Sequence, residues 1–277
     1  MKADCHMHMV LSGGYWKAAM EQHIPHPNEA FIRNALKAWQ EKGYTYLRDG
    51  GDRLGVGAKA RELAPEYGIT YRTPLSPLCK AGHYGAFIGT AFESIKEYAA
   101  LVVRQKKQGA DFVKIMISGL MDFNQFGVLT EPGLNPSEIK ELIHIAHQEG
   151  MAVMAHANGG DTVEAAAAAG VDSVEHGAYL HDGALRAMEE MGTVWVPTLS
   201  TVGNLIGEGR FPDDAVIPIL DSALENLSRY NGLVAPGTDA GAWAVPHGSE
   251  TERPLLYRAG ITDARLAEGT KVIAEKC

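Results

Sequence analysis

The sequence predicts an α/β protein, a (β/α)8 TIM barrel that forms one domain over residues 1–277. Short apolar runs alternate with amphipathic, helix-like segments from one end of the chain to the other. Glycine recurs immediately before the expected strands, where the turn out of a helix needs a left-handed residue. The length of 277 residues also suits such a barrel, which takes about 250.

Eight strands are expected in chain order, each a short apolar run followed by a helical or loop segment. They cover residues 3–9, 44–49, 69–74, 112–118, 152–157, 173–177, 194–199 and 233–238. The amphipathic segments between them predict helices over 29–42, 93–108, 136–149 and 184–191. Within the third of these, 135–138 has the residues of a helix start, and Gly150 follows the helix end.

The same alternation also fits an open, doubly wound parallel sheet, so periodicity alone does not select the barrel. A dinucleotide-binding sheet of that kind would carry GxGxxG directly after its first strand. Here the first strand is followed by Leu-Ser-Gly-Gly-Tyr at 11–15, which does not match. No linker or low-complexity tract interrupts the chain, and one domain is therefore expected.

Composition excludes several classes of partner. A formal net charge of −9 argues against a nucleic-acid partner, which would need a basic face. The longest run of small apolar residues, 165–170, is far short of the roughly 20 that span a bilayer, so no membrane partner is expected. The three cysteines form no CxxC pair and no even set, which favours a reduced, cytoplasmic setting.

Side chains that bind metals fall at corresponding places on the expected strands. His6 and His8 lie on the first strand, where alternation points them to the same face, so that both can bind one ion. Further candidates lie near the carboxyl ends of later strands, namely Lys114, His156, His176 and Asp239. In a barrel these ends converge at the mouth where active sites of this fold are found.

This set of residues resembles the amidohydrolase superfamily. The segments Val113–Gly119 (VKIMISG), Ala155–Ala157 (AHA), Val174–Gly177 (VEHG) and Gly237–Gly241 (GTDAG) are similar to its imidazolonepropionase and prolidase-like branch. The resemblance extends over about residues 3–272.

The resemblance implies a site with two divalent metal ions, for which zinc is expected. Two ligand sets would hold them: His6, His8 and Asp239 around one ion, and His156 and His176 around the other. Lys114 would bridge both ions as a carbamate (N6-carboxylysine). A lysine ammonium beside two cations is repelled, so its pKa falls and the neutral amine can take up CO2.

The activity implied is metal-dependent hydrolysis of a small molecule at an amide, cyclic amide, ester, lactone or dipeptide-type bond. Two metal ions can share a water and lower its pKa toward about 7, and Asp239 would then serve as the acid/base. The loop Gly82–Gly85 is similar to a family loop that closes over substrate, which makes His83 and Tyr84 candidate substrate-binding residues. Basic residues are rare in the loops, with Lys17, Lys80 and Arg210 the nearest candidates, so the substrate class stays open.

Two alternatives remain. A mononuclear deaminase or ring hydrolase of the same superfamily needs no bridging carbamate, so Lys114 argues against it. A non-catalytic, metal-binding barrel is disfavoured by the full ligand set with Asp239. Family relatives also carry a small β-sandwich before the first strand and after the last helix. With five residues before His6 and an end at Cys277, the chain is expected to lack it and to form a homo-oligomer.

Overall fold

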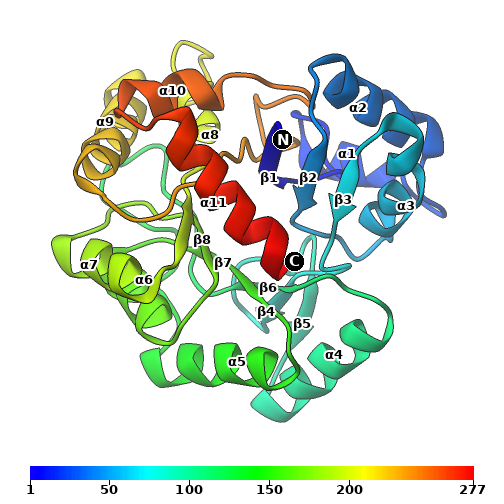
Figure 1. Ribbon diagram of the computed structural model, residues 1–277, viewed down its shortest axis with the longest axis horizontal. Coiled ribbons are helices and arrows are strands. Elements are labelled where there is room, and N and C mark those ends of the chain that lie inside the picture. The colour runs from blue at the N-terminus through cyan, green and yellow to red at the C-terminus, as the bar shows by residue number, and fades with distance from the viewer.

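The computed structural model describes residues 1–277 and contains parallel strands surrounded by helices (Figure 1). The strands are β1 (Ala3–Met7), β2 (Tyr46–Asp49), β3 (Thr70–Arg72), β4 (Leu78–Lys80), β5 (Thr90–Phe92), β6 (Val113–Met116), β7 (Val153–Ala157), β8 (Ser173–His176) and β9 (Val194–Val196). The fold is therefore α/β with parallel pairing throughout, as the sequence predicts.

The α-helices are α1 (Trp16–Glu21), α2 (Glu29–Glu41), α3 (Val56–Leu63), α4 (Ile95–Lys107), α5 (Pro136–Gln148), α6 (Gly160–Ala168), α7 (Asp182–Met191), α8 (Ser200–Gly203), α9 (Asp213–Arg229), α10 (Glu252–Arg258) and α11 (Asp263–Lys276). A 3-10 helix, η1 (Ala64–Tyr67), follows α3. The four helices expected from the sequence correspond to α2, α4, α5 and α7. None of the helices combines the length and apolar character needed to cross a bilayer.

The strands form two sheets, ordered β1-β2-β3 and β5-β4-β6-β7-β8-β9. Residues 233–240 run between β9 and β1, because Val234 bridges Trp195 and Ala240 bridges Met7, both in parallel. The backbone N–H of Cys5 also donates to the carbonyl of Pro236 at 2.8 Å. This segment therefore connects the end of the larger sheet to the start of the smaller one.

The structure shortens the predicted eighth strand, 233–238, to that single bridge at Val234. Pro236 has no N–H to donate and Gly237 has no side chain to pack, so a regular ladder is interrupted there. Conversely, β4 and β5 were not expected from the sequence. Each has only three residues, which is too short for a period-two pattern to be recognised.

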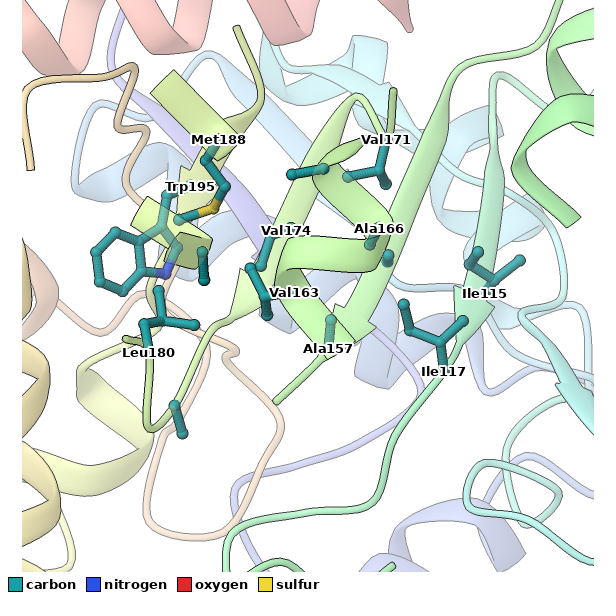
Figure 2. Packing of buried hydrophobic residues seen from close by; sticks show 14 of the residues in the cluster. Ile115, Ile117, Ala157, Val163, Ala166, Val171, Val174, Leu180, Met188 and Trp195 are labelled. Carbon is teal, nitrogen blue, oxygen red and sulfur yellow. The ribbon is translucent and has the colours of Figure 1, made fainter. Parts of the chain in front are cut away.

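Alternation along the strands separates an apolar outer face from a polar inner one. Figure 2 shows outward residues such as Ile115 and Val174, which belong to a buried hydrophobic cluster that includes Val163 of α6 and Met188 of α7. Lys114 and Glu175, each one position away, are also fully buried but belong to no such cluster. The period of two thus places ionisable groups on the face of the strands opposite that cluster.

Helix α11 covers the ends at which the strands begin. Figure 1 shows it crossing in front of the strands, and Ile273 of α11 packs with Ala3, Tyr46 and Val194, the first residues of β1, β2 and β9. Gly269 allows this close approach, because a Cβ there would lie 2.6 Å from the carbonyl carbon of Val234. Loops, and not this helix, lie at the opposite, carboxyl ends of the strands.

Helix α5 offers a test of this packing. Leu142 is 1% exposed, so Leu142→Ala should lower the free energy of unfolding by about 3 kcal/mol through lost burial and a residual cavity. Chemical denaturation of the variant would measure the change. Lys140→Ala, at an exposed position of the same helix, is the control and should change stability by less than about 0.5 kcal/mol. Equal losses in both variants would contradict this packing.

Candidate metal centre

The structure brings all of the predicted ligand side chains to one small cavity of about 70 Å³. They come from β1 and the residue just after it (His6, His8), from β6, β7 and β8 (Lys114, His156, His176) and from the segment after Gly237 (Asp239). All are buried, with Asp239 the most exposed at 9%. Residues far apart in the sequence therefore meet at the carboxyl ends of the strands.

Three of these residues form a tight cluster of donor atoms. His6, His8 and Asp239 each offer one ligand atom, and these atoms all lie within 4.8 Å of one another. Nε2 of His6 and Nε2 of His8 are each 3.6 Å from Oδ1 of Asp239. Two imidazole nitrogens and one carboxylate oxygen at this spacing are a donor set suited to a zinc-like cation.

The other two histidines lie directly beside this cluster. The ring centroids of His156 and His176 are 4.5 Å apart, and those of His6 and His176 are 5.0 Å apart. Tyr84 covers them from the outside, with its ring centroid 4.8 Å from that of His156. The two histidine pairs thus border one continuous space.

Three of the imidazoles use one ring nitrogen to bind the protein and leave the other free. Nδ1 of His6 is 2.7 Å from Oε2 of Glu175, Nδ1 of His176 is 2.7 Å from Oγ1 of Thr198, and Nε2 of His156 donates to the carbonyl of Gly119 at 3.1 Å. Metal-binding histidines are held in this way, because the outer hydrogen bond fixes the tautomer and orients the ring.

Several buried polar atoms at the centre have no hydrogen-bond partner in the protein. They are Nε2 of His6, Nδ1 of His8, Nζ of Lys114 and Oδ1 of Asp239. Unsatisfied buried polar atoms are rare in folded proteins, and a bound cation or its ligands would satisfy Nε2 of His6, Nζ of Lys114 and Oδ1 of Asp239. The residues present therefore fit a divalent metal site.

Burial also shifts the protonation equilibria toward metal-binding forms. Burial, and after it the charge of Lys114, lowers the pKa of His8 and of His156 to about 3. The pKa values of His6 and His176 are lowered for the same principal reason, so all four imidazoles are neutral, as ligands must be. Burial lowers the pKa of the Lys114 ammonium as well, which favours the neutral amine.

A buried ion pair that the sequence analysis missed supports His6. Arg48 of β2 donates from Nη2 to Oε1 of Glu175 at 2.8 Å, from Nη1 to Ser173 at 2.9 Å and from Nε to the carbonyl of Cys5 at 2.6 Å. The second oxygen of Glu175 meets His6, and both charged side chains are at most 2% exposed. Glu175 could have been noticed in the sequence, because it directly precedes His176. No sequence pattern, however, relates Glu175 to Arg48.

Asp4 is a second residue that the sequence analysis left without a role. Its carboxylate accepts the backbone N–H of His6 at 3.1 Å and that of Thr238 at 3.1 Å. Burial raises the pKa of Asp4 to about 7. The carboxylate joins β1 to the segment that carries Asp239, and it thereby fixes the spacing between His6 and Asp239.

Unusual backbone conformations aim two of the predicted ligands. His176 and Asp239 have φ values of 68° and 56°, and Thr198, which contacts His176, has 49°. Left-handed conformations are uncommon outside glycine and concentrate at functional sites. At His176 the left-handed turn brings the side chain to the same cavity as Lys114, although strict alternation after Glu175 would point it outward.

A larger cavity of about 270 Å³ opens outward from this centre and shares His156, His176 and Asp239 with it. Tyr84, a predicted substrate-binding residue, lines both cavities. His83 lines neither, because its ring lies 3.6 Å from the carboxylate of Glu131, so its predicted role in substrate binding stays a prediction. Of the basic candidates, Arg210 lines the cavity, whereas Lys17 and Lys80 do not.

Comparison with protein-family profiles identifies the family of this chain. The profile of the Amidohydrolase family matches residues 3–248, which is most of the sequence. The chain belongs to the amidohydrolase family. The resemblance inferred from the ligand motifs is thereby confirmed at the level of the family, which generally binds divalent metals.

Two curated relatives are similar to this amidohydrolase in sequence. Ochratoxinase of Aspergillus niger is 25% identical over 273 residues, covering 84% of this chain and 55% of the relative. An uncharacterized protein of Mycobacterium tuberculosis is 31% identical over 196 residues, covering 67% of this chain and 52% of its own length. The chain thus spans about half the length of the curated relatives it matches.

Solved structures share the fold. A Xaa-Pro dipeptidase with bound methionine in its active site superposes with a TM-score of 0.78 at 22% identity, over 99% of this chain and 75% of the other. Phenylurea hydrolase B superposes with a TM-score of 0.70 at 13% identity, over 99% and 74%. At these identities the likeness concerns the arrangement of strands and helices.

The outer hydrogen bond of His176 can be tested directly. Thr198→Val keeps the branched shape but removes the oxygen that faces Nδ1, so zinc affinity should fall about 10- to 100-fold. Competition with a chromogenic chelator would measure it. Thr193→Val is the matched control, because its hydroxyl donates to the carbonyl of Val171 far from the ligands. Equal affinities in Thr198→Val and wild type would exclude a supporting role for Thr198.

Proposed function

We propose that this chain is a metal-dependent hydrolase that cleaves an amide bond of a small molecule. One observation carries the proposal, namely the convergence of four neutral imidazoles, a carboxylate and a lysine on a single buried cavity. Among their buried polar atoms, Nε2 of His6, Nζ of Lys114 and Oδ1 of Asp239 have no protein partner. The names of two similar proteins, ochratoxinase and Xaa-Pro dipeptidase, support hydrolytic chemistry in this part of the family.

The proposed centre holds two zinc ions. His6, His8 and Asp239 would bind one, and His156 and His176 the other. Lys114, as its carbamate, would bridge them with two anionic oxygens. The bridging role of Lys114 is supported by its Nζ atom, which is buried, has no partner and belongs to a residue that lines the same cavity as the histidines. Carbamate formation replaces the lysine ammonium, which a metal ion repels, with an anionic group that can bind the ion.

The chain's own residues have separate tasks in the proposed reaction. Bound divalent ions supply Lewis acidity, which polarises a carbonyl and makes water more acidic. Asp239 would accept a proton on the carboxylate oxygen that does not bind an ion, and would return it to the leaving nitrogen. Tyr84 covers the centre and helps to exclude bulk water. Glu175 and Thr198 keep the imidazoles oriented while Asp239 exchanges its proton.

We also propose that the strands close into one (β/α)8 barrel that forms a single domain. The bridges from residues 233–240 to both β9 and β1 support closure on that side. On the other side, the backbone N–H of Asp111, just before β6, donates to the carbonyl of Thr73, just after β3, at 3.0 Å. The helices surround the strands as a barrel requires (Figure 1).

The acid/base assignment predicts a specific loss. Asp239→Asn keeps the size of the side chain but removes its basicity, so kcat for amide hydrolysis should fall by at least about 1000-fold. Circular dichroism and thermal melting should show that the variant remains folded. Near-normal kcat in the folded variant would refute the assignment. Asp172→Asn, which alters a carboxylate bound to His147 and Lys276 remote from the cavity, is a control that should retain kcat.

Metal content and lysine modification give an independent test. Elemental analysis should find about two zinc ions per wild-type chain, as expected for a shared-water site. With 13C-labelled bicarbonate, the wild-type protein should show a carbamate carbon resonance. Lys114→Gln should abolish that resonance and reduce the bound metal. One ion per chain and no carbamate signal would instead favour a mononuclear site.

A further inference from the structure

The outer cavity has an aromatic wall formed by residues that are not among the proposed metal ligands. Twelve of its twenty lining residues are hydrophobic. The large rings come from five separate segments outside the sheets, and they are Tyr15, Trp16, Phe87, Phe123, Phe211 and Trp243. Such a wall binds a ligand with substantial apolar surface, because burying that surface supplies the affinity.

Formal charge is distributed unevenly along this cavity. Asp239 is its only acidic residue and lies at the inner end, where it clusters with the histidines. Arg210 is its only lysine or arginine, and it belongs to the loop after α8. A ligand reaching outward from the centre therefore meets one cation and no second carboxylate. An ammonium group at that position would be repelled, whereas an anionic group would be attracted.

Arg210 is held by ring stacking rather than by an ion pair. Its guanidinium carbon lies 3.8 Å from the ring centroid of Trp243 and 5.3 Å from that of Phe211. Arg210 is exposed, and its side chain takes part in no salt bridge or hydrogen bond within the protein, so the N–H groups of the guanidinium are free. Stacking fixes the plane of the group and leaves its edge available, which is the arrangement that binds a carboxylate through two parallel hydrogen bonds.

We propose that Arg210 is the specificity-determining residue for substrates that carry a free carboxylate, and that the substrate is an N-acylated apolar amino acid. The inference rests on the proposed amide hydrolysis. The amide would lie at the metal centre, the apolar groups against the aromatic wall and the carboxylate at Arg210. Hydrolysis adds one water across the C–N bond and releases a carboxylic acid and the free amino acid.

A matched pair of substrates tests the role of Arg210. N-benzoyl-leucine and its carboxamide differ only in the charge at the end assigned to Arg210. The zinc-loaded wild-type enzyme should show a kcat/KM about tenfold or more higher for the carboxylate, since charge-assisted hydrogen bonds are about twice as strong as neutral ones. In Arg210→Gln this ratio should fall to about one. Arg210→Lys should retain part of it, because the charge remains but the planar fork does not.

Lys17→Gln is the control variant. Lys17 lies 5.4 Å from the ring of Trp16 and is also an exposed cation near the rim, but it does not line the cavity. The substrate preference of this variant should equal that of wild type. An equal loss in Lys17→Gln and Arg210→Gln would indicate general electrostatic attraction and overturn the specific role of Arg210.

A binding measurement separates this inference from the proposed activity. N-benzenesulfonyl-leucine and its carboxamide resist hydrolysis, so calorimetry with the zinc-loaded protein reports recognition alone. The carboxylate should bind wild type about tenfold more tightly than the carboxamide, and Arg210→Gln should remove the difference. If neither benzoyl compound is cleaved but this preference is present and depends on Arg210, amide hydrolysis fails and the binding role stands. A preference that is absent in wild type, or unchanged in Arg210→Gln, overturns it.

Discussion

The buried ion pair between Arg48 and Glu175 is the interaction on which the centre of this protein depends. It joins β2 to β8, and through Nε of Arg48 and Oε2 of Glu175 it also reaches two residues of β1. Two buried charges are tolerable only when both are paired and hydrogen-bonded, and this requirement is met by strands from both sheets. The position of His6 follows from that network, because Glu175 holds its ring from behind.

Beside this network, buried polar atoms of the proposed ligand residues have no partner in the protein. Nζ of Lys114 and Oδ1 of Asp239 are buried and unsatisfied, while Asp4, equally buried, is fully engaged with backbone N–H groups. Buried polar groups therefore fall into two kinds in this protein, those with hydrogen-bond partners and those without. Asp4 and Arg48 hold the strands together, whereas the unsatisfied atoms are the ones that the proposed metal centre would engage.

Much of this arrangement could be predicted from sequence because it follows from local periodicity. A His-x-His pair on a strand faces one side, and the carboxyl ends of parallel strands meet at one edge, so the convergence around His6 and His8 could be anticipated. What could not be predicted depends on non-local or irregular geometry. The pairing of Arg48 with Glu175 joins positions 127 residues apart, the left-handed turn at His176 breaks alternation, and Pro236 interrupts the last expected strand. The stacking of Arg210 on Trp243 likewise joins two loops that no sequence pattern relates.

The aromatic wall and the ligand set are built on different parts of the chain, and this separation bears on how such proteins diversify. His6, Lys114 and His156 lie on strands whose backbones are locked by neighbouring strands, whereas Trp16, Phe211 and Trp243 lie outside the sheets. Replacing a loop residue alters what enters the cavity without moving a ligand atom. A protein with this architecture can therefore change its substrate through a few substitutions in these segments, while the residues of the centre are kept.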